Sequence, residues 1–512
     1  MDGEQLTKDK YEKIMDIAKR RGFIWPSFEL YGGAAGFYDF GPLGAPMKKK
    51  IIQKWRQHYV VEEGLLELES PTITPEPVLK ASGHVDHFTD VMTECKKCSA
   101  SFEVTELVKE ETGDDIEGLS KNEMENYLKE KKITCPECDG KLGEVYEFNT
   151  MFRTAIGPKE DRKAYLRPET AQTIFIDFNR LQRIARRKLP FGVTQIGRGY
   201  RNEISPRRGV IRLREFTMAE AEIFFDPDDP SHPKFSQVSD EKLRFWPSEN
   251  QEEKSRELTE KTAREALDEG IVCNELMAYH LAYAKKFLIS LGLPEDSIRF
   301  REQLPGERAH YSQETWDMEV KSEKFGWVEV AGFAYRTDYD LSQHSKSSGT
   351  DLTVFTQNDD DGKKVLCHVV EPSYGIDRPL YCILEHAYTE DDGRNYLKLK
   401  KDLAPIEAQV FPLVAEEELE KIGKSILKKI NSTGIFAEYD DSGSIGRRYA
   451  RADEVGVPFC ITVDHRTPDD STVTIRERDT TDQIRVKIED LPKTLCKLLN
   501  SEIEFEQAGE KV

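Results

Sequence analysis

The segment 193–225 constrains the fold of this 512-residue chain more than any other stretch. Its two halves have the composition of β-strands, and a polar loop over Ser205–Gly209 joins them, which predicts an antiparallel hairpin. In the second half, a strand period of two places arginine, aromatic and acidic side chains on a single face. That face carries Arg212, Arg214, Phe216, Met218 and Glu220.

The chemistry of this face favours a pocket for an anionic nucleotide beside a small cationic group. Arginine binds phosphate through two parallel hydrogen bonds. An aromatic ring such as Phe216 stacks on a base, and a carboxylate such as Glu220 holds an ammonium group. Cross-strand ion pairs on a solvated face are the alternative. The position of Phe216 between the arginines and Glu220 favours the pocket.

Two other segments have a similar character. Segment 371–378 predicts a strand, a glycine turn and the start of a helix. The strand carries Glu371 and Ser373, and Arg378 lies in the first helical turn, where both the helix N-terminus and arginine favour phosphate. A third strand-like segment contains one acid, Glu329, among apolar neighbours. That acid is either an edge-strand charge or a ligand for a metal on nucleotide phosphates.

The net charge by itself argues against a nucleic-acid partner. Asp and Glu number 95 against 74 Lys and Arg, which gives −21 and a pI near 5.2. We interpret most of the excess acid as a solubilising surface. The segment from Arg180 to Arg214, however, contains eleven basic residues and one acid, Glu203. This basic island needs a separate explanation, and contact with nucleic acid is the one we favour.

Several broad classes are excluded. A hydrophobic content of 38% excludes a disordered chain. No run of apolar residues is long enough to span a membrane, and the first twenty residues lack the apolar stretch of a secretory signal. Nine cysteines, mostly scattered, argue against a disulfide framework. We therefore expect a cytoplasmic protein that does not interact with a membrane.

Composition divides the chain into a large part, 1–400, and a C-terminal part, 401–512. Strands that alternate with helices after residue 401 predict a small separate α/β domain. Two stretches differ from the rest of the large part: about 92–148, which contains four cysteines, and about 226–312, which is charge-rich and predicted to be helical. We expect a multidomain protein of mixed α+β and α/β class, with these stretches as inserts.

The four cysteines of the first insert have the spacing of a metal site. Cys95 and Cys98 form one Cys-x-x-Cys pair, and Cys135 and Cys138 form another. Four thiolates suit tetrahedral Zn²⁺ in a closed structural site. Four free cysteines are the alternative, and a redox role is disfavoured because no thioredoxin-like strand precedes either pair.

Taken in order, the motifs resemble those of class II aminoacyl-tRNA synthetases, and within that class the homodimeric glycyl-tRNA synthetases. The predicted helix 46–63 with Pro71 is similar to motif 1, the hairpin around 201–203 to motif 2, and segment 371–378 to motif 3. The finer likeness lies in longer blocks: YGGAAGFYDFGPLG at 31–44, SGHVD at 82–86, LRPETAQ at 166–172, RNEISP at 201–206, HY and ETWD at 310–317, and EPSYG at 371–375.

The resemblance implies a core built on an antiparallel sheet of six or seven strands, with inserts, and a C-terminal anticodon-binding domain. It implies that ATP and glycine form glycyl-adenylate and that glycine then passes to tRNA(Gly), in a homodimer joined through the motif 1 region. The alternative is a non-catalytic paralogue that binds RNA or regulates a partner. Such paralogues lose the phosphate-binding arginines, which this chain retains. An unrelated zinc-ribbon scaffold would leave the one-sided hairpin unexplained.

Carried over residue by residue, the resemblance implies that Arg201 and Arg378 are catalytic, holding the α- and γ-phosphates, and that Glu329 holds Mg²⁺. The ATP-binding set is Arg201, Asn202, Glu203, Ile211, Arg212, Leu213, Arg214, Glu215, Phe216, Glu329, Val330, Gly375, Ile376, Asp377 and Arg378. The glycine-binding set is Glu169, Phe216, Glu220, Glu371, Ser373 and Gly375.

One departure and two tRNA surfaces complete the expectations. Glu103 stands where resembling sequences tend to carry an arginine. The loop residues Arg207 and Arg208 are placed to meet the 3′ end of the tRNA. The loop 441–449 supplies arginines and a tyrosine for unstacked anticodon bases.

Overall fold

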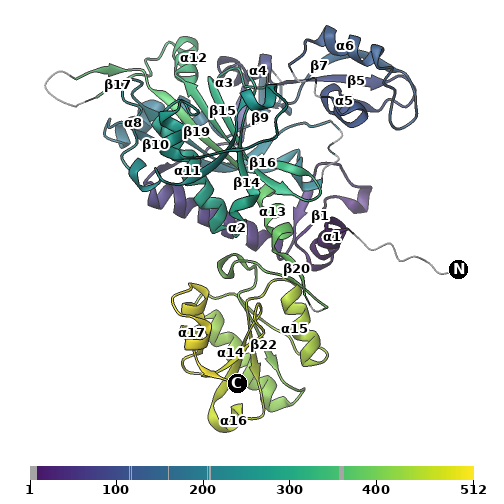
Figure 1. The fold of residues 1–512 in the computed structure, drawn as a ribbon, viewed down its shortest axis with the longest axis vertical. Helices are drawn as coiled ribbons and strands as arrows, with labels where there is room; N and C mark the ends of the chain where they lie inside the picture. Colours follow the sequence, from purple (N-terminus) through teal and green to yellow (C-terminus); the bar gives the residue numbers. More distant parts are fainter. Residues whose placement is uncertain are drawn as a thin grey trace.

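The computed structural model describes residues 9–114, 116, 118–159, 161–204, 206, 209–356, 362–391 and 393–512. Figure 1 shows a large body built around long strands, a lobe that projects from it at the upper right, and a smaller unit below that contains the C-terminus. The lobe corresponds to the cysteine-containing insert, and the lower unit to the α/β domain predicted after residue 401.

The body is organised around a sheet of nine strands, counted over the described residues. The six strands from β14 to β10 pair antiparallel throughout, which confirms the predicted antiparallel core. The parallel pairs β12–β14 and β3–β10 extend it beyond the expected six or seven strands. In sheet order the strands are β13 (Thr259–Thr262), β12 (Lys242–Trp246), β14 (Ile298–Glu302), β15 (Glu314–Ser322), β16 (Gly326–Thr337), β19 (His368–Gly375), β11 (Glu215–Phe225), β10 (Phe191–Tyr200) and β3 (Leu66–Glu67).

The predicted hairpin forms the centre of the functional face. Strands β10 and β11 pair without interruption from Phe191 opposite Phe224 to Tyr200 opposite Glu215. Beyond its first two residues, β11 is buried along its whole length, because β19 covers its other edge and helices cover the sheet. Its acidic residues therefore lie in the interior, where an ionised carboxylate needs a partner.

Long helices pack on this sheet and build the main core. Helix α2 (Gly44–Arg56) continues as one turn of π-helix over Gln57–Glu62, in agreement with the predicted helix 46–63. Its buried residues recur every four positions and face the sheet. Helices α11 (Glu275–Ser290) and α13 (Asp377–Ala387) join the same core. The buried residues of α2 and its extension include Met47, Ile51, Trp55 and Tyr59.

The segment 226–312 is not the helical insert that the sequence predicted. It contains α9 (Ser248–Glu252), α10 (Ala263–Asp268) and α11, but also β12, β13 and β14, which enlarge the central sheet. The strands β12 and β14 bury alternate apolar residues, among them Leu243, Phe245, Ile298 and Phe300. The alternation of apolar residues in these strands was not recognised in the sequence, because the strands are short and lie in a charge-rich segment.

The projecting lobe has a core of its own. Strands β5 (Thr89–Cys95), β6 (Ser101–Glu103) and β7 (Leu142–Asn149) form an antiparallel sheet, covered by α5 (Val104–Thr112) and α6 (Lys121–Glu130). Phe102, Leu107, Val108, Met124 and Leu128 are buried between them. Because β6 leads directly into α5, the start of that helix is held at the edge of the cysteine cluster.

The C-terminal unit has a six-stranded sheet and a separate hydrophobic core. Its strands, in sheet order, are β23 (Ala437–Tyr439), β22 (Ala408–Pro412), β24 (Phe459–Val463), β25 (Thr472–Glu477), β26 (Gln483–Lys487) and β27 (Glu510–Lys511). Its helices are α14 (Glu417–Asn431), α15 (Ile445–Glu454), α16 (Thr467–Asp470) and α17 (Leu491–Leu499).

The remaining elements line the edges of the body. They are α1 (Lys10–Arg21), β1 (Ile24–Pro26), β2 (Tyr38–Phe40), β4 (Ile73–Pro75), α3 (Glu76–Ala81), α4 (His84–His87), β8 (Arg153–Ile156), β9 (Arg162–Leu166), α7 (Gln172–Ile176), α8 (Phe178–Ile184), α12 (Tyr339–Ser348), β17 (Val354–Phe355), β18 (Lys364–Val365), β20 (Tyr388–Asp391) and β21 (Arg394–Leu397). Among the described helices, none has the length and apolar character needed to cross a membrane.

Candidate active site

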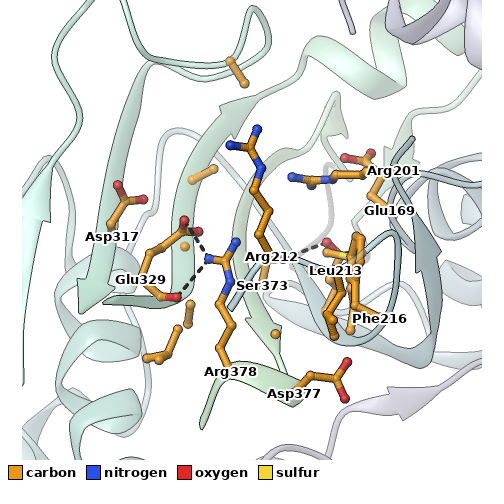
Figure 2. Close-up of a pocket in the computed structure, with 18 of the residues that line it drawn as sticks. Glu169, Arg201, Arg212, Leu213, Phe216, Asp317, Glu329, Ser373, Asp377 and Arg378 are labelled. Atoms are coloured by element: carbon orange, nitrogen blue, oxygen red, sulfur yellow. Dashed lines mark hydrogen bonds and ion pairs between the residues drawn. The ribbon is translucent and has the colours of Figure 1, made fainter. Parts of the chain in front are cut away.

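A cavity of about 320 Å³ opens on the face of the sheet formed by β11, β16 and β19 (Figure 2). This volume is within the range of small-molecule sites. Most of the predicted ligand-binding residues line it. They are Glu169, Arg201, Glu203, Ile211, Arg212, Leu213, Phe216, Glu220, Glu329, Val330, Glu371, Ser373, Gly375, Asp377 and Arg378.

Arg201 follows the end of β10 and enters the cavity between two aromatic rings. Its guanidinium lies 5.5 Å from the ring centre of Phe216 and 5.3 Å from that of Phe88. Its buried Nε atom has no hydrogen-bond partner within the described residues. A buried donor without an acceptor is costly unless a ligand supplies one, so this geometry suits an anion above Phe216. Phe88 lies outside the motifs and was not predicted.

Arg378 lies in the first turn of α13, as predicted. Its Nη1 atom donates to the main-chain oxygen of Glu329 at 2.9 Å and to the Glu329 carboxylate at 3.0 Å, and its Nε donates to the main-chain oxygen of Ile211 at 2.9 Å (Figure 2). Burial opposes ionisation of Glu329, yet Arg378 holds the pKa of Glu329 below its ordinary value. The neighbouring Asp377 accepts from the main-chain N–H of Thr217 at 2.6 Å and pairs with the buried Lys48, so the helix start is anchored to β11 and α2.

Arg212 is surrounded by three carboxylates, two of which come from the projecting lobe. It donates from Nε to Glu203 at 2.6 Å, from Nη1 to Glu106 at 2.9 Å and from Nη2 to Glu103 at 2.6 Å. Burial lowers the pKa of Arg212, but the three carboxylates outweigh it and raise that pKa. Glu103, where an arginine was expected, therefore has an arginine as its partner.

Four predicted residues do not line the cavity. Asn202 donates its main-chain N–H to Thr150, and Ile376 is buried against Thr217. Arg214 donates to the main-chain oxygens of Glu203 and Ala35. Arg214 and Arg212 both precede the first residue of β11, so the strand period used to place them on one face does not apply. The fourth, Glu215, lies 3.6 Å from Arg198.

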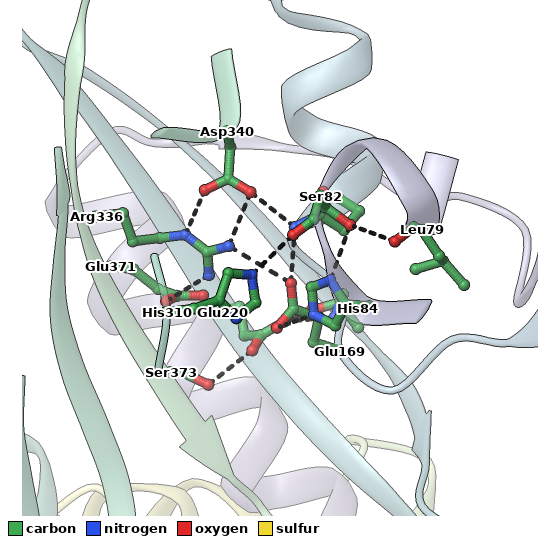
Figure 3. A network of polar contacts seen from close by, with 12 residues as sticks. Leu79, Ser82, His84, Glu169, Glu220, His310, Arg336, Asp340, Glu371 and Ser373 are labelled. Carbon is green, nitrogen blue, oxygen red and sulfur yellow. Dashed lines mark hydrogen bonds and ion pairs between the residues drawn. The ribbon is translucent and has the colours of Figure 1, made fainter. Parts of the chain in front are cut away.

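Four of the residues predicted to bind glycine, Glu169, Glu220, Glu371 and Ser373, lie close together in one polar network at what we call the floor of the cavity (Figure 3). Glu220 accepts hydrogen bonds from Ser373 Oγ at 2.7 Å and from the main-chain N–H of Thr170 at 2.5 Å. Burial and the neighbouring Glu169 raise the pKa of Glu220 against these donors. Phe216 and Gly375 also line the cavity. The floor therefore presents three buried acidic side chains, Glu169, Glu220 and Glu371, which suits a small ammonium group.

The other two acids of the floor share one cation. Arg336 donates to Glu371 at 2.9 Å and lies 3.6 Å from Glu169. Burial opposes ionisation of Glu169, yet His84 and Arg336 outweigh it and hold the pKa of Glu169 below its ordinary value. Burial is also the largest effect on Glu371, whose pKa rises to about 8 although Arg336 opposes the rise.

Several cavity residues were not predicted. Tyr311 and Asp317 belong to the quoted blocks HY and ETWD, so the motif that contains them was the available signal. Asp317 accepts from Gln303 at 2.9 Å, and burial raises the pKa of Asp317 well above its ordinary value. Arg336 does not line the cavity but contacts Glu169 and Glu371, which do; it lies in a strand outside every quoted motif, and nothing in the sequence singled it out.

The four predicted cysteines come together in the lobe. Their sulfur atoms lie within 4.8 Å of one another, and the pairs Cys95–Cys138 and Cys98–Cys135 are 3.6 Å apart. A tetrahedron with Zn–S bonds of about 2.3 Å has sulfur–sulfur edges of about 3.8 Å. The main-chain N–H of Lys97 also donates to Cys95 Sγ at 3.4 Å. The donor set and its spacing fit a structural zinc ion.

The predicted tRNA surfaces have different outcomes. Arg207 and Arg208 lie outside the described residues. Segment 441–449 is not a loop throughout, because α15 begins at Ile445. Arg448 is buried and donates to the main-chain oxygen of Gly443 at 3.0 Å, and Tyr449 shares a hydrogen bond of 2.6 Å with Thr462, so both are structural. Arg448 is buried and Tyr449 half-buried because both lie on the inner face of the amphipathic helix, and Arg447 is the exposed arginine of this segment.

Comparisons with known proteins agree on one family. Residues 146–387 match the model of the tRNA synthetase class II core domain (G, H, P, S and T), and residues 407–498 match that of the anticodon-binding domain. A glycine–tRNA ligase of Pyrococcus abyssi is 50% identical over 96% of this chain and 99% of its own length. One of Methanocaldococcus jannaschii is 47% identical over 95% of this chain and 98% of its own length.

Solved structures show the same fold at low identity. The crystal structure of prolyl-tRNA synthetase from Cryptosporidium parvum complexed with halofuginone and AMPPNP has a TM-score of 0.57 and 16% identity. The similarity covers 97% of this chain and 77% of that chain. The class II core with a C-terminal anticodon-binding domain, expected from the motifs, is therefore confirmed as the fold.

Proposed function

The chain belongs to the glycine–tRNA ligase family of class II aminoacyl-tRNA synthetases, and on that premise we propose how its residues carry out the reaction. The enzyme attaches glycine to tRNA(Gly) with ATP, through a glycyl-adenylate intermediate. The observation that carries the residue assignment is the position of Arg201 and Arg378 in one cavity above an acidic floor.

In the first step, the glycine carboxylate attacks the α-phosphorus of ATP and pyrophosphate leaves. Arg201 binds the α-phosphate, since its buried Nε has no other partner, and Phe216 stacks on adenine with Arg212 and Glu203 nearby. Arg378 binds the γ-phosphate. No general base is needed, because the attacking carboxylate is already ionised, and the rate comes from positioning and charge stabilisation.

Glycine is held by its two charged ends, since it has no side chain to bind. Its ammonium group is received by Glu169, Glu220 and Glu371, with Ser373 as a neutral partner. These side chains are buried and mutually braced, so a larger amino acid meets atoms that cannot move aside. Steric exclusion of this kind discriminates more strongly than the absence of one methylene contact, which is worth about 1–3 kcal/mol.

Two metals accompany this function in our proposal. Mg²⁺ enters with ATP, and the Glu329 carboxylate at the cavity wall is the oxygen ligand we assign to it. When bound, this ion neutralises charge on the phosphates. Zn²⁺ is held by Cys95, Cys98, Cys135 and Cys138 and orders the lobe without taking part in the chemistry.

The assembly and partners follow the family pattern in our proposal. We take 1–400 as the catalytic core and 401–512 as the anticodon-binding domain, with the motif 1 region around α2 as the surface that joins two copies. The tRNA 3′ end approaches through Arg207 and Arg208, and the exposed Arg180 and Arg183 of α8 offer further positive charge to the acceptor stem. Because the product feeds protein synthesis, we place the reaction in the cytoplasm.

Amino-acid-dependent ATP–pyrophosphate exchange tests the proposal directly. We expect exchange with glycine and at least about a hundredfold less with alanine or serine, because the buried floor leaves no room for a side chain. Arg201→Ala should reduce exchange about a hundredfold or more while the fold is unchanged. Absence of exchange with every amino acid, in folded and zinc-loaded protein, would instead support the non-catalytic paralogue.

A further inference from the structure

Arg336 lies beneath the glycine floor without reaching the cavity. It is on β16, its side chain is 0% exposed, and it is not among the residues that line the cavity. Two of its partners, Glu169 and Glu371, do line the cavity. Figure 3 shows its guanidinium at the centre of the carboxylates that surround the floor. Arg336 can therefore affect the substrate only through these neighbours.

All three guanidinium nitrogens of Arg336 donate hydrogen bonds. Nε and Nη2 donate to the two oxygens of Asp340 at 2.8 and 3.0 Å, and Nη1 donates to Glu371 at 2.9 Å. Its flat face lies 3.7 Å from the ring centre of Tyr311, itself a cavity residue. The planar guanidinium has fixed donor directions, so it orients Asp340, Glu371 and Tyr311 at the same time. The ammonium group of a lysine is a point charge and does not do this.

Charge at this floor is strongly unbalanced. Five buried carboxyl groups lie at this floor, namely Glu169, Glu220, Glu222, Asp340 and Glu371. Within the described residues, the buried basic groups that pair with them are Arg336, with Glu169, Asp340 and Glu371, and His84, which lies 3.3 Å from Glu169. Buried carboxylates without a cation are neutralised by protonation. Both oxygens of Glu222 are buried without a partner, as expected of an uncharged group. Arg336 contacts both Glu169 and Glu371, so its position influences the direction and the charge of these two acids.

We propose that Arg336 is a positioning residue for the amino acid: by bracing Glu169 and Glu371 against Asp340 and Tyr311, it fixes the direction and charge of the carboxylates that receive the glycine ammonium. This inference rests on the proposed assignment of those glutamates to glycine. It also separates glycine binding from ATP binding. Within the described residues, Arg336 makes its hydrogen bonds and ion pairs with Asp340, Glu371 and Glu169, and Arg378 makes its own with Glu329 and Ile211, so removal of Arg336 should leave ATP binding intact.

The test compares Arg336→Lys with Arg476→Lys in the full-length protein. Arg476 is a matched control in the C-terminal unit, since it also pairs with both oxygens of one aspartate, Asp453, and also lies over a tyrosine ring, Tyr449. ATP–pyrophosphate exchange is measured as a function of glycine concentration, of ATP concentration and of pH. In Arg336→Lys we expect the KM for glycine to rise about tenfold or more, the KM for ATP to change by less than about twofold, and the pH dependence of kcat/KM for glycine to shift. Arg476→Lys should show none of these changes.

An Arg336→Lys enzyme with unchanged glycine KM and pH profile would overturn the inference. If this variant does not fold, Asp340→Asn replaces it, because that change removes the brace and keeps Arg336. A raised glycine KM in Asp340→Asn supports the inference, and an unchanged one overturns it. If the wild-type protein shows no glycine-dependent exchange, the proposed function is overturned, and the inference with it. If the wild type shows normal exchange but the variants keep an unchanged glycine KM and pH profile, only the inference is overturned.

Discussion

Glu371 on β19 titrates in a range that activity measurements can reach. Burial raises its pKa to about 8, Arg336 opposes the rise, and Glu220 and Glu169 add to it. Glu222, Asp340, Tyr311 and His84 are further ionisable groups in this network. Below pH 8 the carboxyl group is protonated, so binding an ammonium group requires release of that proton, which weakens binding.

We therefore expect kcat/KM for glycine to rise with pH, by up to about tenfold per unit below about pH 8, and to level off above it. Glu371→Gln should remove the slope and lower the plateau. Exchange assays at saturating ATP from about pH 6 to about pH 8.5 measure both effects. A wild-type profile that falls over this range, or a Gln variant that keeps the slope, would contradict the role of Glu371.

Glu222 gives a second prediction, about stability. Burial raises its pKa well above the ordinary value, so the folded protein keeps a proton that the unfolded chain releases as pH rises. The wild type should thus lose stability between mildly acidic and alkaline pH. Glu222→Gln, which has no proton to release, should be within about 1 kcal/mol of wild type near pH 6 and relatively more stable near pH 9. Thermal unfolding midpoints at both pH values test this, and a large loss near pH 6 would mean that Glu222 is charged.

Single residues also show how far the sequence could predict the site. Glu220 and Phe216 were assigned correctly to one face because they lie inside β11, where the strand period holds. Arg214 was misplaced because it precedes the strand. Arg336 could not be predicted, since its partners come from β19, α12 and the loop before α7, and only the folded chain brings these together.

Among the elements, the cysteine-containing lobe contacts the cavity through Arg212. Cys98 is followed by β6, which ends at Glu103, and α5 then carries Glu106. Both acids pair with Arg212, which lines the cavity. Because Glu103 and Glu106 lie only a few residues after Cys98, a change in the structure of the lobe should change the position of Arg212. The sequence predicted the cysteine cluster from its spacing, but it gave no sign of this contact, because Glu103 appeared only as a departure from the expected arginine.

Loss of the proposed zinc ion should therefore raise the KM for ATP more than the KM for glycine. We expect Cys98→Ser to raise the KM for ATP about three- to tenfold and to leave the KM for glycine within about twofold, because Arg212 loses two of its three anchors. Glu106→Gln should give a smaller change in the same direction. Exchange kinetics with zinc content measured on the same samples provide the comparison. Equal increases in both KM values would indicate general unfolding of the cavity instead.

Helices and strands could be predicted from the sequence where their hydrophobic residues recur with a clear helix or strand period. The hairpin and α2 were predicted because their buried residues recur at the strand or helix period over many positions. The strands β12 and β14 were missed because they are short and flanked by charge, and their burial comes from neighbours far away in the sequence.

At the scale of the whole molecule, the body and the C-terminal unit contact each other but have separate hydrophobic cores. Arg20 and Arg21 of α1 pair with Glu454 of α15, and Lys50 of α2 pairs with Glu407, so the C-terminal unit is held against the body. The cavity nevertheless draws its lining residues from the body. Activation of glycine and recognition of tRNA should therefore respond to different substitutions.

This separation predicts opposite outcomes for two arginines. Arg378→Ala should abolish pyrophosphate exchange, since the γ-phosphate loses its ligand, and should leave tRNA binding nearly intact. Arg447→Glu should keep exchange and lower kcat/KM for tRNA about tenfold, because an exposed cation of α15 is reversed in the unit that faces the polyanion. Lys428→Glu, the same reversal at an exposed position of α14, is the matched control and should have little effect. Equal loss of exchange and tRNA binding in either arginine variant would mean that the two units act as one site.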